Sequence, residues 1–157
     1  MTQVQPEPSP EEVGRLSARI GGSARLSTIG LRELHWKAHD LAVSEPMIDT
    51  DANFNIVHVG QDRLVRYRVT LKLKAIAEGQ ILFELEAAYD AIFELGGDDV
   101  YSEEEYQAFG SVSVFFMLYP YLRSVVHRVT VEGGFPPLIL APIQFPFGVL
   151  ASSPVDA

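Results

Sequence analysis

Hydrophobic and polar positions alternate most regularly in two neighbouring segments, residues 64–76 and 81–95. In the first segment every second residue of Val65–Ala75 is apolar or aromatic, and the positions between are Arg, Thr and Lys. In the second segment every second residue of Phe83–Phe93 is apolar or aromatic, and the other face is mostly acidic. A period of two is the pattern of a β-strand with one buried face. The two segments therefore predict neighbouring strands.

The short connection Glu78–Gln80 predicts how these strands pair. A three-residue hairpin loop sets Lys74 opposite Glu84 and Lys72 opposite Glu86. Opposite charges then meet on one face, and apolar residues meet on the other. A shift of one residue would destroy both patterns, so the charges and the apolar residues predict the same register.

Two further strands precede this hairpin. Residues 26–39 alternate with a change of phase, which predicts a strand with a β-bulge. Residues 40–52 contain loop signals, and residues 54–59 form the second predicted strand. Residues 60–62 then read as a hairpin turn.

Two short helices are indicated by their capping residues. Ser9 and Pro10 are typical of a helix start, and Gly21-Gly22 predicts its end. Residues 102–105, Ser-Glu-Glu-Glu, form a capping box with acidic residues in the first turn. This second helix is expected to be interrupted near Gly110.

A long helix is predicted over residues 111–131, with Pro120 inside it and Gly133-Gly134 at its end. Few of its positions are polar, which is typical of a helix that is buried nearly all round. A single sheet covers one side only, so a second copy of the chain is the expected cover for the other. The predicted interface between copies comprises Phe116, Tyr119, Leu122, Val125, Val126 and Val129.

These elements predict an α+β fold, in which the long helix packs on one face of a four-stranded antiparallel sheet. We expect one domain over residues 11–147. Residues 1–10 are expected to be disordered, because they are polar and rich in proline. Residues 148–157 are expected to form a flexible tail.

Composition narrows the function classes. The 157 residues are 47% hydrophobic and carry a net charge of −9, which disfavours nucleic acid and anionic membranes as partners. There is no cysteine, so neither disulfides nor thiolate chemistry are expected. We find no signal-peptide pattern and no apolar run of about twenty residues. A cytoplasmic protein without membrane insertion is the expectation.

The residues that could carry chemistry do not form a catalytic pattern. His35 and His39 lie on a predicted strand, about 13 Å apart at 3.3 Å per residue, which is too far to share a metal ion. No nucleophile elbow, phosphate-binding loop or dinucleotide fingerprint is present. We therefore predict no catalytic residue, no metal site and no cofactor.

Charge and aromatic residues point instead to binding. No Lys or Arg occurs between Lys74 and Arg123, whereas acidic residues are frequent there. Such an interval is either a solvated surface or a docking patch for a basic partner. Aromatic residues are also abundant outside the central hairpin, and apolar side chains on loops and tails can form adaptable binding grooves.

The stretch Leu118–Phe145 resembles the end of the SecB family of export chaperones. In that family a Phe/Tyr-Pro-Tyr helix leads into Gly-x-Phe-Pro-x-Leu-x-Leu-Ala-Pro-Ile/Val-x-Phe, and this chain has Tyr-Pro-Tyr followed by Gly-Phe-Pro-Pro-Leu-Ile-Leu-Ala-Pro-Ile-Gln-Phe. The resemblance extends over residues 27–145. It implies a homotetramer, built as a dimer of dimers, that holds unfolded polypeptides in apolar grooves without ATP and delivers them to the SecA motor.

The resemblance also implies site residues. Trp36 and Phe93 match aromatic positions of the peptide groove, and Glu33 and Glu86 match acidic positions of the face that docks SecA. Lys37 departs from the family, because it stands at a further acidic position. The predicted peptide-binding residues are Trp36, Met47, Phe54, Phe93, Phe109, Phe145 and Phe147. The predicted docking residues are Glu33, Glu84 and Glu86.

Two alternatives remain open at the level of the sequence. The predicted N-terminal helix is similar to that of SecB-like chaperones that guard antitoxins of toxin–antitoxin systems, so the client can be an antitoxin. A small enzyme or small-ligand binder would use the same sheet and helix, but it requires a convergent polar site.

Overall fold

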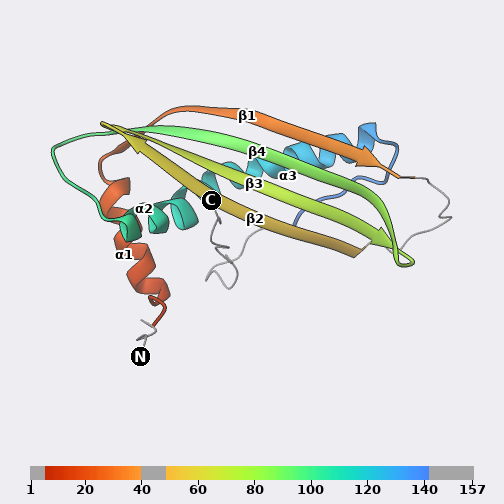
Figure 1. Cartoon of the computed structure of the whole chain (residues 1–157), viewed down its shortest axis with the longest axis horizontal. Coiled ribbons are helices and arrows are strands. Elements are labelled where there is room, and N and C mark those ends of the chain that lie inside the picture. The colour runs from red at the N-terminus through yellow and green to blue at the C-terminus, as the bar shows by residue number, and fades with distance from the viewer. Residues whose placement is uncertain (1–5, 40–48, 142–157) are drawn as a thin grey trace.

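Four long antiparallel strands form one sheet, which a long helix crosses on one face (Figure 1). The computed structural model describes residues 6–39 and 49–141. The strands are β1 (Ala24–Ala38), β2 (Asp49–Gln61), β3 (Leu64–Ala77) and β4 (Gln80–Leu95), in the spatial order β1-β4-β3-β2. The helices are α1 (Pro10–Gly21), α2 (Glu103–Phe109), the π-helical segment η1 (Gly110–Val114) and α3 (Phe115–Glu132). The predicted fold class is confirmed.

The register of the β3–β4 hairpin is the predicted one. Lys74 pairs with Glu84 and Lys72 pairs with Glu86. The loop itself is shorter than expected, because Ala77 pairs with Gln80 and only two residues lie between them. Both loop residues, Glu78 and Gly79, have a positive φ, 51° and 73°, as a two-residue type I′ turn requires. A register shift directly after Ala75 restores the predicted pairing.

The bounds of the two outer strands differ from the expected ones, since β1 covers Ala24–Ala38 where residues 26–39 were expected. The second strand covers Asp49–Gln61, whereas residues 54–59 were expected. Its turn to β3 lies at Asp62 and Arg63, later than the expected 60–62. In β1 the pairing shifts twice, between Leu26 and Thr28 and between Leu31 and Glu33. The second shift confirms the predicted bulge.

The helix caps follow the sequence signals. The side chain of Ser9 accepts a hydrogen bond from the Glu12 N–H, and the capping box of Ser102 and Glu105 is complete. The predicted interruption near Gly110 is the π-helical turn η1. A Cβ atom at Gly110 would lie 2.8 Å from the Tyr67 ring, so only glycine lets the helix approach β3 this closely.

The helix α3 forms the core with the inner face of β3 and β4. Leu118, Leu122 and Val126 of this helix are fully buried. Its opposite side is exposed in this single chain, and the exposed residues are Pro120, Tyr121, Ser124, His127, Arg128, Val131 and Glu132. Cover of this side by a second copy stays a prediction. Among the described helices, only the continuous span Glu103–Glu132 is long and apolar enough to cross a membrane. Half of its most apolar window is buried inside the protein, as in a core helix.

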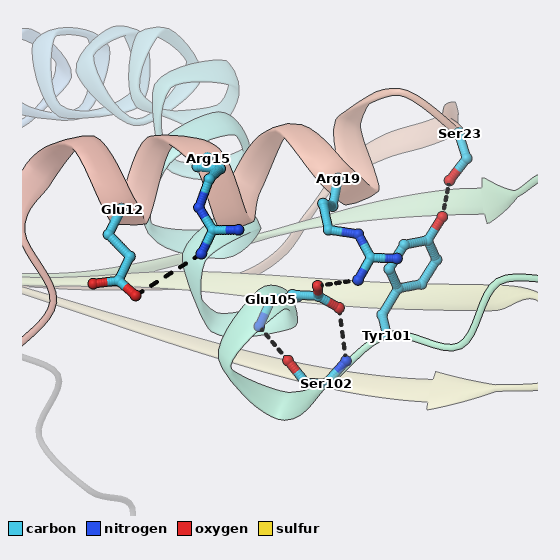
Figure 2. Close-up of polar contacts among 7 residues, drawn as sticks. All are labelled: Glu12, Arg15, Arg19, Ser23, Tyr101, Ser102 and Glu105. Carbon is cyan, nitrogen blue, oxygen red and sulfur yellow. Dashed lines mark hydrogen bonds and ion pairs between the residues drawn. The ribbon is translucent and has the colours of Figure 1, made fainter. Parts of the chain in front are cut away.

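The helices α1 and α2 lie together at one end of the sheet (Figure 1). Figure 2 shows the polar contacts between them, in which Arg19 of α1 reaches the buried carboxylate of Glu105 at 2.5 Å. The same Arg19 guanidinium lies over the Tyr101 ring. The Tyr101 hydroxyl contacts Ser23, just after α1. These contacts hold the N-terminal helix against the start of the long helical segment.

Candidate functional site

A first aromatic cluster forms where α3 ends. Trp36, near the end of β1, stacks on Phe83 with ring centroids 4.8 Å apart and meets Phe135 edge-on at 5.9 Å. Phe83 and Phe135 are buried, whereas Trp36 is only half-buried. The Trp36 ring also rests on Gly133, where a Cβ atom would lie 2.5 Å from its Cζ2 atom. The ring is therefore held by contacts with three residues and remains partly exposed to solvent.

A second aromatic cluster forms on the opposite edge of the sheet. Phe54, on β2, meets Phe115 edge-on at 5.1 Å and lies 5.9 Å from the ring of Tyr119. Phe54 is half-buried, and its two partners are buried. Burial raises the pKa of the Tyr119 hydroxyl, which remains a neutral hydrogen-bond donor. It donates to the carbonyl oxygen of Ala141.

The apolar segment 135–141 joins the two clusters. It begins with Phe135 in the first cluster and ends with Ala141 at Tyr119 in the second. The segment has no regular secondary structure. Its main chain is held by side chains, since the Leu138 N–H donates to the Thr130 hydroxyl at 3.1 Å. The segment thus connects the clusters of the two edge strands, and Ile139 within it is exposed.

A second apolar surface lies along β1. Leu26, Leu31 and Leu34 are on the inner face of this strand, opposite buried residues of β4, yet each is exposed. β1 is an edge strand, with a strand partner on one side only within the described residues. Tyr89, which pairs with Leu31, contacts the exposed Tyr121 of α3 at 5.6 Å. We refer to Leu26, Leu31, Leu34 and Tyr121 as the β1–α3 strip.

The predicted docking residues lie on the outer face of the sheet, away from both apolar surfaces. Each lies beside basic groups. Glu33 is 3.6 Å from Arg68. Glu84 is 3.9 Å from Lys74 and 3.2 Å from the His39 ring. Glu86 lies between His35 on β1 and Lys72 on β3.

Comparison with known proteins decides the family. The family model described as preprotein translocase subunit SecB matches residues 36–147. The protein-export protein SecB of Caulobacter vibrioides is 30% identical over 156 residues, which cover 98% of this chain and 93% of that protein. The chain belongs to the SecB family of protein-export chaperones. The SecB of Paramagnetospirillum magneticum is 34% identical over 102 residues, or 64% of this chain and 61% of that protein.

A solved structure agrees on the fold. The SecB-like chaperone Rv1957 of Mycobacterium tuberculosis, in complex with a ChAD peptide from the Rv1956 HigA1 antitoxin, matches with a TM-score of 0.77. The match is 24% identical and covers 83% of this chain and 98% of that one. SecB is a family of chaperones rather than of enzymes, which fits the absence of a catalytic pattern in the sequence.

The structure separates the predicted peptide-binding residues into three groups. Trp36 and Phe54 are half-buried on the two edge strands, each beside buried aromatics. Phe93 and Phe109 are only 2% and 3% exposed, and their rings pack on each other at 5.1 Å. Because Phe93 and Phe109 are buried, they belong to the hydrophobic core, and nothing in the structure supports a contact of either ring with a client. Met47, Phe145 and Phe147 lie outside the described residues.

The predicted interface between copies also receives a different placement. Tyr119, Leu122, Val125, Val126 and Val129 are buried within this one chain, and Phe116 is half-buried. The physical reason is that α3 packs its most apolar side on the sheet of its own chain. The side that α3 offers to another molecule is the opposite one, and an interface through the buried residues stays a prediction without support here.

Sequence reasoning missed the partners that make these sites. Phe83, Phe115 and Phe135 complete the two aromatic clusters, and the three exposed leucines of β1 form the second surface. The alternating apolar positions of β1 predict that these leucines are buried. Only the strand order, which puts β1 at an edge, shows that this side of the inner face is open.

Proposed function

We propose that this SecB-family protein is an ATP-independent holdase that binds unfolded polypeptides along the path from Trp36 to Phe54. The observation that carries the proposal is the arrangement of the two half-buried aromatics, which are joined by the apolar segment 135–141. Because this segment is not paired in the sheet, its main chain can hydrogen-bond an extended client. Apolar side chains of the client would then pack on the exposed faces of the aromatic rings.

The test is suppression of aggregation of a reduced, unfolded model protein at stoichiometric ratios without nucleotide. Trp36→Ala and Phe54→Ala should each weaken client binding, measured by fluorescence anisotropy, more than they lower stability. Val59→Ala is the matched control, because Val59 is an exposed apolar residue on the outer side of β2. Normal client binding by the Trp36→Ala/Phe54→Ala double variant would contradict the proposed site.

The second part of the proposal is self-association, as a homotetramer in the cytoplasm. The β1–α3 strip supports it, because several large apolar side chains are exposed together beside an open strand edge. An exposed strand edge can pair with another chain, and a large exposed apolar patch marks an interaction site. Light scattering at micromolar concentration tests it, and a mass near 17.4 kDa would exclude self-association.

An antitoxin client is the second candidate function. The basic groups beside Glu33, Glu84 and Glu86 favour it over delivery to SecA, because they oppose the acidic face that docking of that motor was predicted to need. Calorimetry with purified SecA at low salt separates the two. Binding that Glu86→Lys abolishes would support delivery to the motor.

A further inference from the structure

We propose that Arg123 donates a hydrogen bond to an oxygen atom of the client that lies on the path from Trp36 to Phe54. The inference rests on the proposed function and adds to it a polar contact, which the two aromatic clusters do not supply. The oxygen atom belongs to a carboxylate or to a main-chain carbonyl group of the client, since a guanidinium group donates to both.

The guanidinium group of Arg123 lacks the acceptors that a partly buried group of this kind requires. Arg123 is half-buried on α3, and its Nε atom is buried without a hydrogen-bond partner. Within residues 6–39 and 49–141 its side chain forms no ion pair either. By contrast, the half-buried Arg68 donates two hydrogen bonds to the carboxylate of Asp90. Because a buried donor without an acceptor is unfavourable, an oxygen atom brought by another molecule would be bound here.

Helical spacing puts Arg123 on the side of α3 along which the apolar segment 135–141 runs. At about 100° per residue, Tyr119, Arg123 and Thr130 lie within about 40° of one another around the helix axis. Tyr119 and Thr130 hold the segment through their hydroxyl groups. Arg123 therefore lies between the two residues that anchor the segment, and so lies on the proposed path of the client.

The charge of Arg123 also acts on the second aromatic cluster. Burial raises the pKa of the Tyr119 hydroxyl, and the positive charge of Arg123 opposes that rise. The ring of Tyr119 lies 5.9 Å from that of Phe54, between centroids. A client whose apolar side chain packs on Phe54 would thus bring its own oxygen atoms close to the guanidinium group.

The same helical spacing separates Arg123 from the surface proposed for self-association. Tyr121 of the β1–α3 strip lies about 160° around the helix from Arg123. Tyr121 contacts Tyr89 on the β1 side of the sheet, whereas the neighbour of Arg123, Tyr119, contacts Phe54 on β2. A client on the aromatic path, rather than a second copy on the strip, is therefore the molecule that reaches this guanidinium group.

The test uses two fluorescein-labelled peptides of twelve residues, in which Leu and Phe surround either a central Glu or a central Gln. Anisotropy measures their binding to the wild type and to Arg123→Met, which keeps a long side chain but removes every donor. Arg123→Met should bind about tenfold more weakly, as expected when a hydrogen bond from a charged donor is lost. The matched control is Arg128→Met, since Arg128 is an exposed base of the same helix, and it should bind like the wild type.

The two peptides identify the source of the oxygen atom. If a carboxylate of the client is the acceptor, Arg123→Met weakens binding of the Glu peptide alone, and added salt weakens binding of that peptide to the wild type. If a main-chain carbonyl group is the acceptor, Arg123→Met weakens binding of both peptides equally. Either result supports the role of Arg123.

A stability measurement separates this role from a merely structural one. The urea midpoint of Arg123→Met should equal or exceed that of the wild type, because the variant removes an unpaired buried donor. A lower midpoint together with weaker binding would overturn the inference, and so would a lower oligomer mass. Unchanged binding of both peptides by Arg123→Met, beside weaker binding by Trp36→Ala, would overturn it and leave the proposed function intact. Absence of binding of either peptide to the wild type would refute both.

Discussion

The ring of Trp36 lies against the backbone of Gly133, so that a Cβ atom at position 133 would fall 2.5 Å from the ring. The contact joins an edge strand to the end of the long helix. Gly133, which follows the last residue of the helix, therefore has a second role, which is to make room for this aromatic residue.

Gly133→Ala should destabilise the protein by about 1–3 kcal/mol, because the added methyl group must displace the indole ring. Its φ of −74° is normal for alanine, so backbone strain does not explain the loss. Urea denaturation measures it, and Trp36 fluorescence should shift as the ring moves. The matched control is Gly14→Ala in α1, where nothing lies within 4 Å of the added Cβ atom. This variant should be stabilised by about 0.5–1 kcal/mol. Equal effects of the two variants would contradict the contact.

Phe93→Ala and Phe109→Ala should each lower stability by about 3–5 kcal/mol, because both rings are buried in the core. Once the amount of folded protein is corrected for, both variants should bind clients with the affinity of the wild type. Thermal denaturation and client anisotropy on the same samples make the comparison. A folded Phe93→Ala protein that binds clients poorly would restore its predicted place in the groove.

The exposed and buried sides of α3 should respond differently to mutation. Tyr121→Glu and Leu34→Glu should lower the mass of the oligomer and keep the fold, because both side chains are exposed in the single chain. Leu122→Ala should instead cost about 2–5 kcal/mol of stability and keep the mass, because Leu122 is fully buried. Light scattering and circular dichroism together decide the matter. An unchanged mass in both glutamate variants would exclude the β1–α3 strip as the interface.

The contact between α1 and α2 should depend on pH through Glu105. The hydrogen bond from the Ser102 N–H lowers the pKa of this carboxyl group, burial opposes the shift, and Arg19 lowers the pKa further. A carboxyl group with a lowered pKa in the folded state stabilises the protein above its unfolded pKa. That contribution is lost as the pH falls from about 4.5 through the folded pKa.

Glu105→Gln should therefore be less stable than the wild type at pH 7, and the difference should shrink below about pH 4.5. Urea titrations at several pH values measure the difference directly. Glu104→Gln is the control, because Glu104 is an exposed neighbour in the same helical turn. A difference that grows at low pH would contradict the role assigned to Glu105.

The sequence by itself determined the local structure and the pairing of the central hairpin. Complementary charges favour Lys72 opposite Glu86, because a shift of one residue would set charged residues opposite apolar ones. The caps at Ser9 and Ser102 and the glycine pair after α3 likewise depend on neighbours in the chain. The family was recognisable for a similar reason, since its motif is contiguous from Leu118 to Phe145.

Only the tertiary structure decided which apolar and charged residues are available to partners. Phe93 and Trp36 look alike in the sequence, yet β4 is an inner strand and β1 is an edge, so one ring is buried and the other is half-open. The acids of β4 look like a negative face until β1 and β3 place bases on both sides of them. Exposure and net charge of a surface are set by neighbours distant in the chain, and strand order is what brings those neighbours together.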